Sequence, residues 1–279
     1  MTYVVENFNS LKELIKANET RKPNKVFAGK HQASDERDSD RDSFTRTKSY
    51  AEAVELMRNG YAEPLEKIKR GVEANMQGMS AEKTAVKNDI VGYAPCVPNA
   101  ILGIPQSMIN KELTVKKSKI LTIIHDATSN CDTSTETFIK AGIATLTIVN
   151  SLEKRGYRVS LRVAFKNSRA CEQRTFATVT VKDWRQPLDL QKMTFPFCHP
   201  SMLRRIGFKW LETTPRLTER DFAYGYGRSL SGVDSYEDIV KELTEKHLIA
   251  DNEKYINLDL CKRKEFDAQE IARACGLEI

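Results

Sequence analysis

The sequence predicts an α/β domain with three layers, in which helices cover both faces of a mostly parallel sheet. Residues 120–125, ILTIIH, form a short and mainly apolar run, which is typical of a central strand buried on both faces. Residues 137–156 carry apolar side chains at helical spacing, and residues 157–165 then alternate strictly between apolar and polar side chains. A strand, a helix and a second strand in this order indicate a parallel pair joined by a right-handed crossover.

The N-terminal residues 1–48 are predicted to be peripheral to this core. Residues 8–17 have the apolar spacing of a short helix, whereas residues 30–48 are polar and charged and contain almost no apolar side chain. Such a segment buries too little surface to offset the entropy of ordering it, so we expect a mobile connection.

Residues 49–118 are predicted to form helices and a loop that packs on the core. Ser49 and Glu52 have the spacing of a capping box, and Gly60 suits the end of the helix that follows. Residues 92–105 hold three prolines and two glycines among apolar side chains, a composition that indicates an ordered loop pressed against a core.

The α/β core is predicted to span residues 119–279. Residues 174–184 form another strand-like run, which can pair with residues 157–165 as a hairpin and place an antiparallel strand near the sheet edge. Pro200 suits the first turn of a helix, and further helices and one strand follow it. Strands that alternate with helices in this way favour a layered α/β fold.

The composition is that of an ordinary globular protein, with 40% hydrophobic and 29% charged residues. No apolar run approaches the ~20 residues of a membrane span, and the N-terminus lacks the pattern of a secretory signal. We therefore expect a soluble, cytoplasmic protein without a membrane partner. The six cysteines form no CxxC pair, which gives no indication of a structural zinc site.

A candidate site follows the first core strand. Asp126, Thr128 and Asn130 supply carboxylate, hydroxyl and amide oxygens directly after that strand, where sheets of this class bind ligands. These hard oxygen ligands suit Mg²⁺ or Mn²⁺, with water completing the coordination shell. The same residue types are also the preferred caps of a following helix, so a purely structural role stands beside the metal site.

Residues 126–130, DATSN, resemble a degenerate form of the Asp-x-Ser-x-Ser metal-dependent adhesion motif of von Willebrand A domains. The resemblance covers residues 119–275 and implies a von Willebrand A-like or Rossmann-like fold that binds protein partners through a divalent cation. Asn130 departs from the motif, which has a hydroxyl there. The later threonine and aspartate of the motif have only candidate matches, which are Thr213, Thr214 and Asp234.

The whole chain is also similar to an uncharacterised family of phage-encoded proteins. Three segments carry this similarity: SYAEAVELMRNGY at 49–61, GIPQSM at 103–108 and HPSMLRRIGF at 199–208. The similarity implies a source rather than an activity.

Three further features could carry function. Arg204, Arg205 and Lys209, with Arg216 and Arg220, could form a basic patch for phosphate or an acidic partner, although a solvated helix face is the simpler explanation. The segment 224–228, YGYGR, could stack on a nucleic acid strand or form a structural turn. Zinc binding or a cysteine–histidine nucleophile would require the convergence of residues that are distant in sequence: His125, Cys131, Cys198 and His199.

The leading hypothesis is a non-enzymatic, phage-encoded protein-binding module that acts through the strand-end face, in one version aided by a divalent cation bound at Asp126. An alternative is a nucleic-acid-binding protein of phage replication or packaging, motivated by the net charge of +6 and by Arg204 and Arg205. A third hypothesis is a metal-dependent hydrolase, although no second cluster of acid, base or nucleophile accompanies Asp126.

Overall fold

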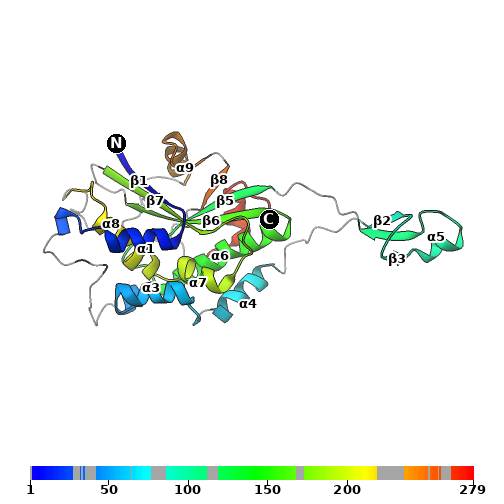
Figure 1. Ribbon diagram of the computed structural model, residues 1–279, viewed down its shortest axis with the longest axis horizontal. Coiled ribbons are helices and arrows are strands. Elements are labelled where there is room, and N and C mark those ends of the chain that lie inside the picture. The colour runs from blue at the N-terminus through cyan, green and yellow to red at the C-terminus, as the bar shows by residue number, and fades with distance from the viewer. Residues whose placement is uncertain are drawn as a thin grey trace.

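A five-stranded sheet forms the centre of the molecule in the computed structural model (Figure 1). Its strands lie in the order β1-β7-β6-β5-β8, and every neighbouring pair is parallel except β6 and β7. The predicted mostly parallel sheet with one hairpin is therefore confirmed. The strands are β1 (Thr2–Phe8), β5 (Ile120–Asp126), β6 (Arg158–Asn167), β7 (Gln173–Lys182) and β8 (Glu253–Ile256). The structure describes residues 2–27, 32, 34, 42–63, 65–76, 86–111, 119–167, 173–218, 236–250, 252–256, 258 and 265–279.

The predicted strand–helix–strand unit is β5, α6 (Thr135–Lys154) and β6. Ser134 caps helix α6, because it adopts the extended backbone of a cap and its hydroxyl accepts the N–H of Thr137. The helix stops at Gly156, whose φ of +86° suits glycine. The unit brings the carboxyl ends of β5 and β6 to the same edge of the sheet.

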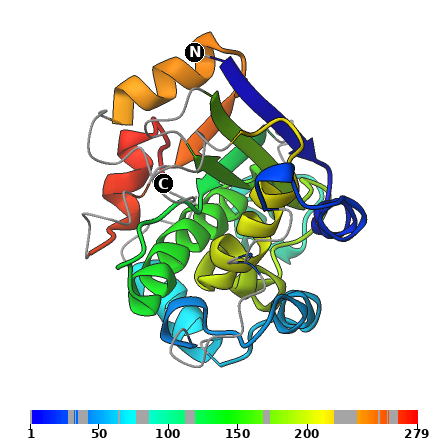
Figure 2. The same cartoon turned by 90° about the vertical axis from the view of Figure 1, so that its left-hand side faces the viewer.

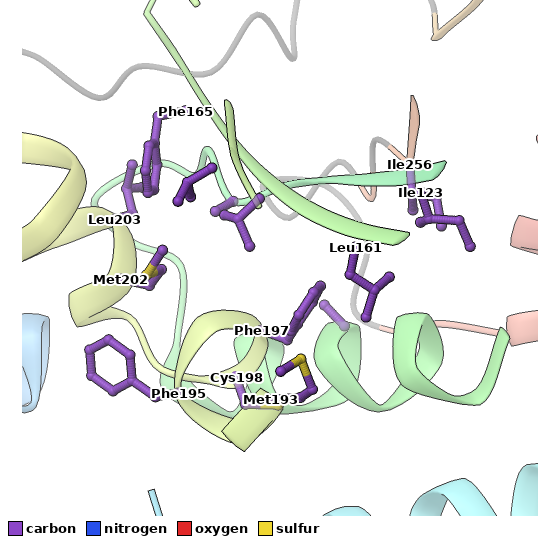
Figure 3. Packing of buried hydrophobic residues seen from close by; sticks show 14 of the residues in the cluster. Ile123, Leu161, Phe165, Met193, Phe195, Phe197, Cys198, Met202, Leu203 and Ile256 are labelled. Atoms are coloured by element: carbon purple, nitrogen blue, oxygen red, sulfur yellow. The ribbon is translucent and has the colours of Figure 1, made fainter. Parts of the chain in front are cut away.

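Helices cover both faces of this sheet (Figure 2). On one face, the largest apolar cluster joins the sheet to α6 and to the helices of the middle and C-terminal parts of the chain. Figure 3 shows Leu161 of β6 pointing toward Phe197 within this cluster. A smaller cluster on the other face joins Ile124 and Phe176 to Ile239 and Leu243 of α9. The helices are α1 (Leu11–Thr20), α3 (Tyr50–Asn59), α4 (Leu65–Met76), α7 (Leu190–Cys198), α8 (Phe208–Thr213), α9 (Tyr236–Glu245) and α10 (Ala268–Ala274).

The N-terminal segment is not peripheral, which corrects the prediction for residues 1–48. Strand β1 pairs with β7 along its whole length, and its Val4 and Phe8 are buried in the main apolar cluster. Residues 42–48, predicted to be mobile, include the short helix α2 (Asp42–Thr45) and the buried Thr47. Local sequence could not indicate β1, because the strand with which it pairs, β7, lies more than 160 residues away in the chain. A short 3₁₀ turn, η1 (Lys25–Phe27), lies between these parts.

The proline- and glycine-rich segment forms a second, separate sheet. Its strands lie in the order β2-β4-β3 and are antiparallel, and the short helix α5 belongs to the same unit. Figure 1 shows this unit standing apart from the rest of the molecule, so the predicted packing on the core is wrong. Its elements are β2 (Val86–Asp89), β3 (Ala94–Pro95), α5 (Val97–Ile101) and β4 (Met108–Lys111).

The cap predicted at Ser49 is present. The hydroxyl of Ser49 accepts the N–H of Glu52, while the carboxylate of Glu52 accepts the N–H of Lys48, the residue before the cap, in place of that of Ser49. Helix α3 ends at Gly60, as predicted. Among the described residues, no helix is both long enough and apolar enough to cross a membrane.

Candidate functional site

Four buried residues gather where three parallel strands end. We call Asp126, Thr128, Lys166 and Tyr255 the strand-end centre. Asp126 ends β5, while Lys166 and Tyr255 lie on its two neighbours, β6 and β8. Each of the four is at most 3% exposed. The sequence predicted Asp126 and Thr128 but missed Lys166 and Tyr255, because only the sheet order brings these two strands to either side of β5.

Lys166 is the electrostatic partner of Asp126. Its ammonium lies 2.9 Å from Oδ2 of Asp126 and donates a hydrogen bond of 3.0 Å to the hydroxyl of Tyr255. The same ammonium lies 5.2 Å from the centroid of the Tyr255 ring. A lysine inside a ten-residue strand is the one signal that could have identified it from sequence, since a buried lysine requires a partner.

The pKa of Asp126 lies below its usual value. Burial by itself raises that pKa, but the positive charge of Lys166 and hydrogen bonds from Thr128, Tyr255 and Lys166 outweigh the effect of burial. Asp126 is therefore an ionised carboxylate whose counter-charge comes from the protein itself.

The three predicted metal ligands have other roles in this arrangement. The N–H of Thr128 donates to Oδ1 of Asp126 at 2.9 Å, and its hydroxyl accepts the N–H of Lys166 at 3.2 Å. The backbone carbonyl of Asn130 accepts a hydrogen bond from Arg204 at 2.8 Å. Both oxygens of the Asp126 carboxylate are thus engaged, so the residues as arranged do not fit a divalent cation. Metal binding stays a prediction.

The remaining candidates from the adhesion motif do not complete a metal site either. The hydroxyls of Thr213 and Thr214 donate to carbonyls of the preceding helical turn, those of Lys209 and Trp210. Asp234 lies outside the described residues. Within the described part of the chain, no three or more histidine, cysteine, aspartate or glutamate side chains are grouped for a metal ion.

Arg204 holds the loop after β5 and is not part of a surface patch. It is 2% exposed, and its guanidinium donates to the carbonyls of Phe44, Asn130 and Thr133. The rings of Phe44 and Phe138 lie 4.1 and 5.2 Å from the guanidinium carbon. Burial lowers the pKa of Arg204 to about 10, so the group still carries its charge at neutral pH.

Arg205 is buried as well, which corrects the prediction of an exposed basic patch. Its guanidinium donates to the carbonyls of Ser34 and Thr47 and to the hydroxyl of Thr45. Both arginines lie on the π-helical turn η3 (Met202–Gly207), and the neighbouring carbonyls supply the acceptors that offset their desolvation.

The other basic residues of the proposed patch do not replace the two arginines. Lys209 is half-buried, and its ammonium donates to the side-chain oxygen of Gln32. Arg216 is exposed. Arg220 and the segment 224–228 lie outside the described residues. The described part of the patch therefore offers a partner only one exposed arginine.

Three of the four histidine and cysteine candidates, His125, Cys198 and His199, are buried structural groups, whereas Cys131 is exposed. His125 contacts the hydroxyl of Thr145 at 3.0 Å, and burial lowers its pKa to about 4. Burial lowers the pKa of His199 to about 4 as well, and raises the pKa of the Cys198 thiol. A thiol that stays protonated is a poor nucleophile and a poor zinc ligand.

Most of the exposed large apolar side chains in the described chain lie on the separate sheet. We call this sheet and its helix, residues 86–111, the arm. None of its side chains at 87–110 is buried. No charged residue occurs between Ile90 and Asn110. Outside the arm, only Val5 and Ile120 are exposed large apolar residues in the described chain. The exposed fractions in the arm are Ile90 66%, Val91 74%, Tyr93 64%, Val97 58%, Ile101 79%, Leu102 72% and Ile104 38%.

Hydrogen bonds, and not a core, shape the arm. The N–H of Cys96 donates to the carbonyl of Ser107, and the amide of Asn99 donates to the carbonyl of Gln106. Gly92 runs so close to β4 that a Cβ there would lie 2.2 Å from the carbonyl oxygen of Ile109. A small sheet without a buried face is marginally stable, so the arm gains from any partner that covers its apolar side chains.

The comparison with known proteins gives a family and no function. The model of a domain of unknown function, DUF7192, matches residues 2–278. The chain belongs to this family. The DUF7192 match spans the arm and the α/β body alike. No curated protein and no solved structure matches the chain.

Proposed function

We propose that this chain is a protein-binding protein and that the arm is its binding element. The observation that carries the proposal is the set of seven large apolar side chains, 38–79% exposed, on a unit without a buried side chain at 87–110. Exposed apolar surface of this kind marks interaction sites in soluble proteins. Moving one such side chain from water into an interface contributes roughly 1.5–3 kcal/mol.

The arm supports a protein partner better than a nucleic acid. Nucleic acids are bound through lysine and arginine contacts to phosphate, and residues 90–110 contain neither. The nucleic-acid hypothesis rests on the net positive charge and on Arg204 and Arg205, and the burial of both arginine side chains weakens it. Hydrolysis by a metal at Asp126 is likewise weakened, because Lys166 already neutralises that carboxylate.

The proposed binding surface lies on the arm and not on the strand-end face. That face was the first candidate because Asp126, Thr128 and Asn130 follow a central strand. Asp126 and Thr128 are each 3% exposed, which leaves little for a protein partner to contact. Protein binding thus remains the proposed function, with a different part of the chain carrying it.

Site-specific photocrosslinking in the native cell tests the proposal. The photoreactive amino acid p-benzoylphenylalanine replaces Tyr93 on the arm in one sample and Lys154, an exposed residue of α6, in the control. We expect a protein adduct from position 93 and a much weaker one from position 154. Adducts only to lipid or nucleic acid at position 93, or none, would contradict the proposal.

A second variant separates specific contact from mere accessibility. Ile101→Asp places a charge on the most exposed apolar position of the arm, where it disturbs no buried contact. The adduct at position 93 should fall at least tenfold in that background. An unchanged yield would show that the apolar surface does not drive the contact.

A further inference from the structure

The two edges of the arm sheet differ in their capacity to accept another strand. β3 has only two residues, and one of them is Pro95, which has no N–H to donate. β2 lies at the opposite edge, has four residues without proline, and pairs on one side with β4. Among the described residues no strand pairs with its other side. β2 is therefore the edge that can be extended.

We infer that a second copy of this chain occupies this edge, with the two β2 strands paired antiparallel about a two-fold axis at Asn88. The inference rests on the proposed function, because it names the partner of the arm. In this register Lys87 lies opposite the partner's Asp89, and Asp89 lies opposite the partner's Lys87. Opposite charges directly across two strands stabilise the pair.

The same two charges disfavour the neighbouring registers. A shift that centres the axis on Lys87 places two lysines opposite each other, and a shift to Asp89 places two aspartates opposite each other. Like charges in these positions are destabilising. The charge pattern of β2 is thus self-complementary in one register only, as a two-fold symmetric contact requires.

The distribution of apolar surface favours the arm of a second copy over its body. Outside the arm, the described residues expose only Val5 and Ile120 as large apolar side chains, so the described body offers no matching apolar patch. The arm itself offers the same uncharged surface, from Ile90 to Asn110, on both copies. Joining two arms also gives one six-stranded sheet, which supplies the size that each three-stranded sheet lacks.

Charge-swap variants of the full chain test this inference by sedimentation velocity over a range of concentrations. We expect the wild type to dimerise, and Lys87→Asp and Asp89→Lys each to weaken self-association at least tenfold. The double variant Lys87→Asp/Asp89→Lys restores opposite charges and should dimerise nearly as well as the wild type. A wild type that stays monomeric up to roughly 100 µM, or a double variant as weak as the singles, would overturn the inference.

A cysteine at the two-fold axis gives an independent readout. Residues directly opposite in an antiparallel pair have Cβ atoms roughly 4.5–5.5 Å apart, close enough for a strained or slightly adjusted disulfide. Asn88→Cys should form a covalent dimer under mild oxidation much faster than the wild type, whose described free cysteines are Cys96, Cys131, Cys198 and Cys275. Equal rates for the two proteins would count against pairing at Asn88.

The two proposals fail in different ways. A monomeric wild type whose position 93 still crosslinks to another protein would overturn the pairing of two copies and leave protein binding by the arm intact. A monomeric wild type that binds vesicles of zwitterionic phosphatidylcholine through the arm, without protein adducts, would overturn both. Circular dichroism of each variant checks that the loss of association is not a loss of folding.

Discussion

At the scale of single residues, the ion pair with Lys166 makes Asp126 a structural carboxylate and not an open metal ligand. Sequence placed an aspartate, a threonine and an asparagine where a metal site belongs. The lysine within the next strand was visible in the sequence, but only the sheet pairing shows that it faces Asp126. With the ammonium 2.9 Å from the carboxylate and both side chains at most 3% exposed, the centre is a buried ion pair. Such a pair need not add net stability, but removing one partner leaves an unpaired buried charge.

Lys166→Met should therefore lower the free energy of unfolding by about 3–5 kcal/mol. Asp126→Asn/Lys166→Met, which removes both charges, should recover a large part of that loss. Urea unfolding of the three proteins measures these differences. A Lys166→Met protein that is as stable as the wild type, and that Mg²⁺ stabilises further, would restore the metal site.

The buried histidines predict how stability depends on pH. His125 and His199 have folded-state pKa values of about 4, whereas an unfolded histidine has a pKa near 6.5. Between these values the unfolded chain binds more protons, so stability is fully present above pH ~6.5 and falls as the pH drops toward 4. The loss should reach roughly 3 kcal/mol per histidine.

Urea unfolding at pH 7 and pH 5 checks this dependence of stability on pH. In a His199→Phe variant, the free energy of unfolding should change clearly less between the two pH values. Asp126 adds a separate effect at lower pH. Its folded-state pKa is depressed, so its contribution is present above pH ~4 and is lost as the pH falls below that. Equal stabilities at pH 7 and pH 5 would contradict the burial of the two histidines.

At the scale of elements, α6 and α7 pack unusually closely at Gly142. A Cβ at this position would lie 2.3 Å from Sγ of Cys198 and 2.8 Å from the carbonyl oxygen of Phe197. The carbonyl belongs to the backbone of α7, so the helices would have to separate. The contact explains a glycine in the middle of a long helix, where it otherwise costs stability.

Gly142→Ala should consequently destabilise the protein by about 1–3 kcal/mol in spite of the better helix propensity of alanine. Gly71→Ala is the matched control, because Gly71 also lies within a helix but the three nearest atoms to its added Cβ all belong to the side chain of Ile143 and none to a backbone. Thermal unfolding should give Gly142→Ala a clearly lower unfolding temperature than Gly71→Ala. The opposite ranking would show that α6 and α7 are not held this closely.

The elements that sequence predicted are those with a local signal. The apolar run of β5, the long periodicity of α6 and the alternation of β6 each depend on residues within one segment. β1 was missed because its burial depends on β7, and the arm was assigned to the core because its apolar side chains usually indicate burial. Arg204 and Arg205 were expected at the surface, since no pattern showed that the loop carbonyls of Asn130 and Thr47 would accept their hydrogen bonds.

At the scale of the whole molecule, the strand-end centre has a structural role and the arm is the proposed binding element. The buried polar groups of the strand-end centre are paired with one another, whereas the arm presents an exposed apolar surface. Ile101→Asp should accordingly leave the unfolding temperature of the body within about 1 °C of the wild type, because the side chain makes no core contact. Scanning calorimetry at a concentration low enough to keep the chain monomeric measures this. A large drop would show that the arm supports the body.

Hydrogen–deuterium exchange at a low and a high protein concentration tests the pairing of two arms most directly. We expect the backbone amides of Val86–Asp89 to become protected as the concentration rises, while the loop at 127–133 exchanges at the same rate in both samples. The charge-reversed Lys87→Asp protein should show no such protection. Exchange in the arm that is independent of concentration, or protection confined to 127–133, would contradict the account.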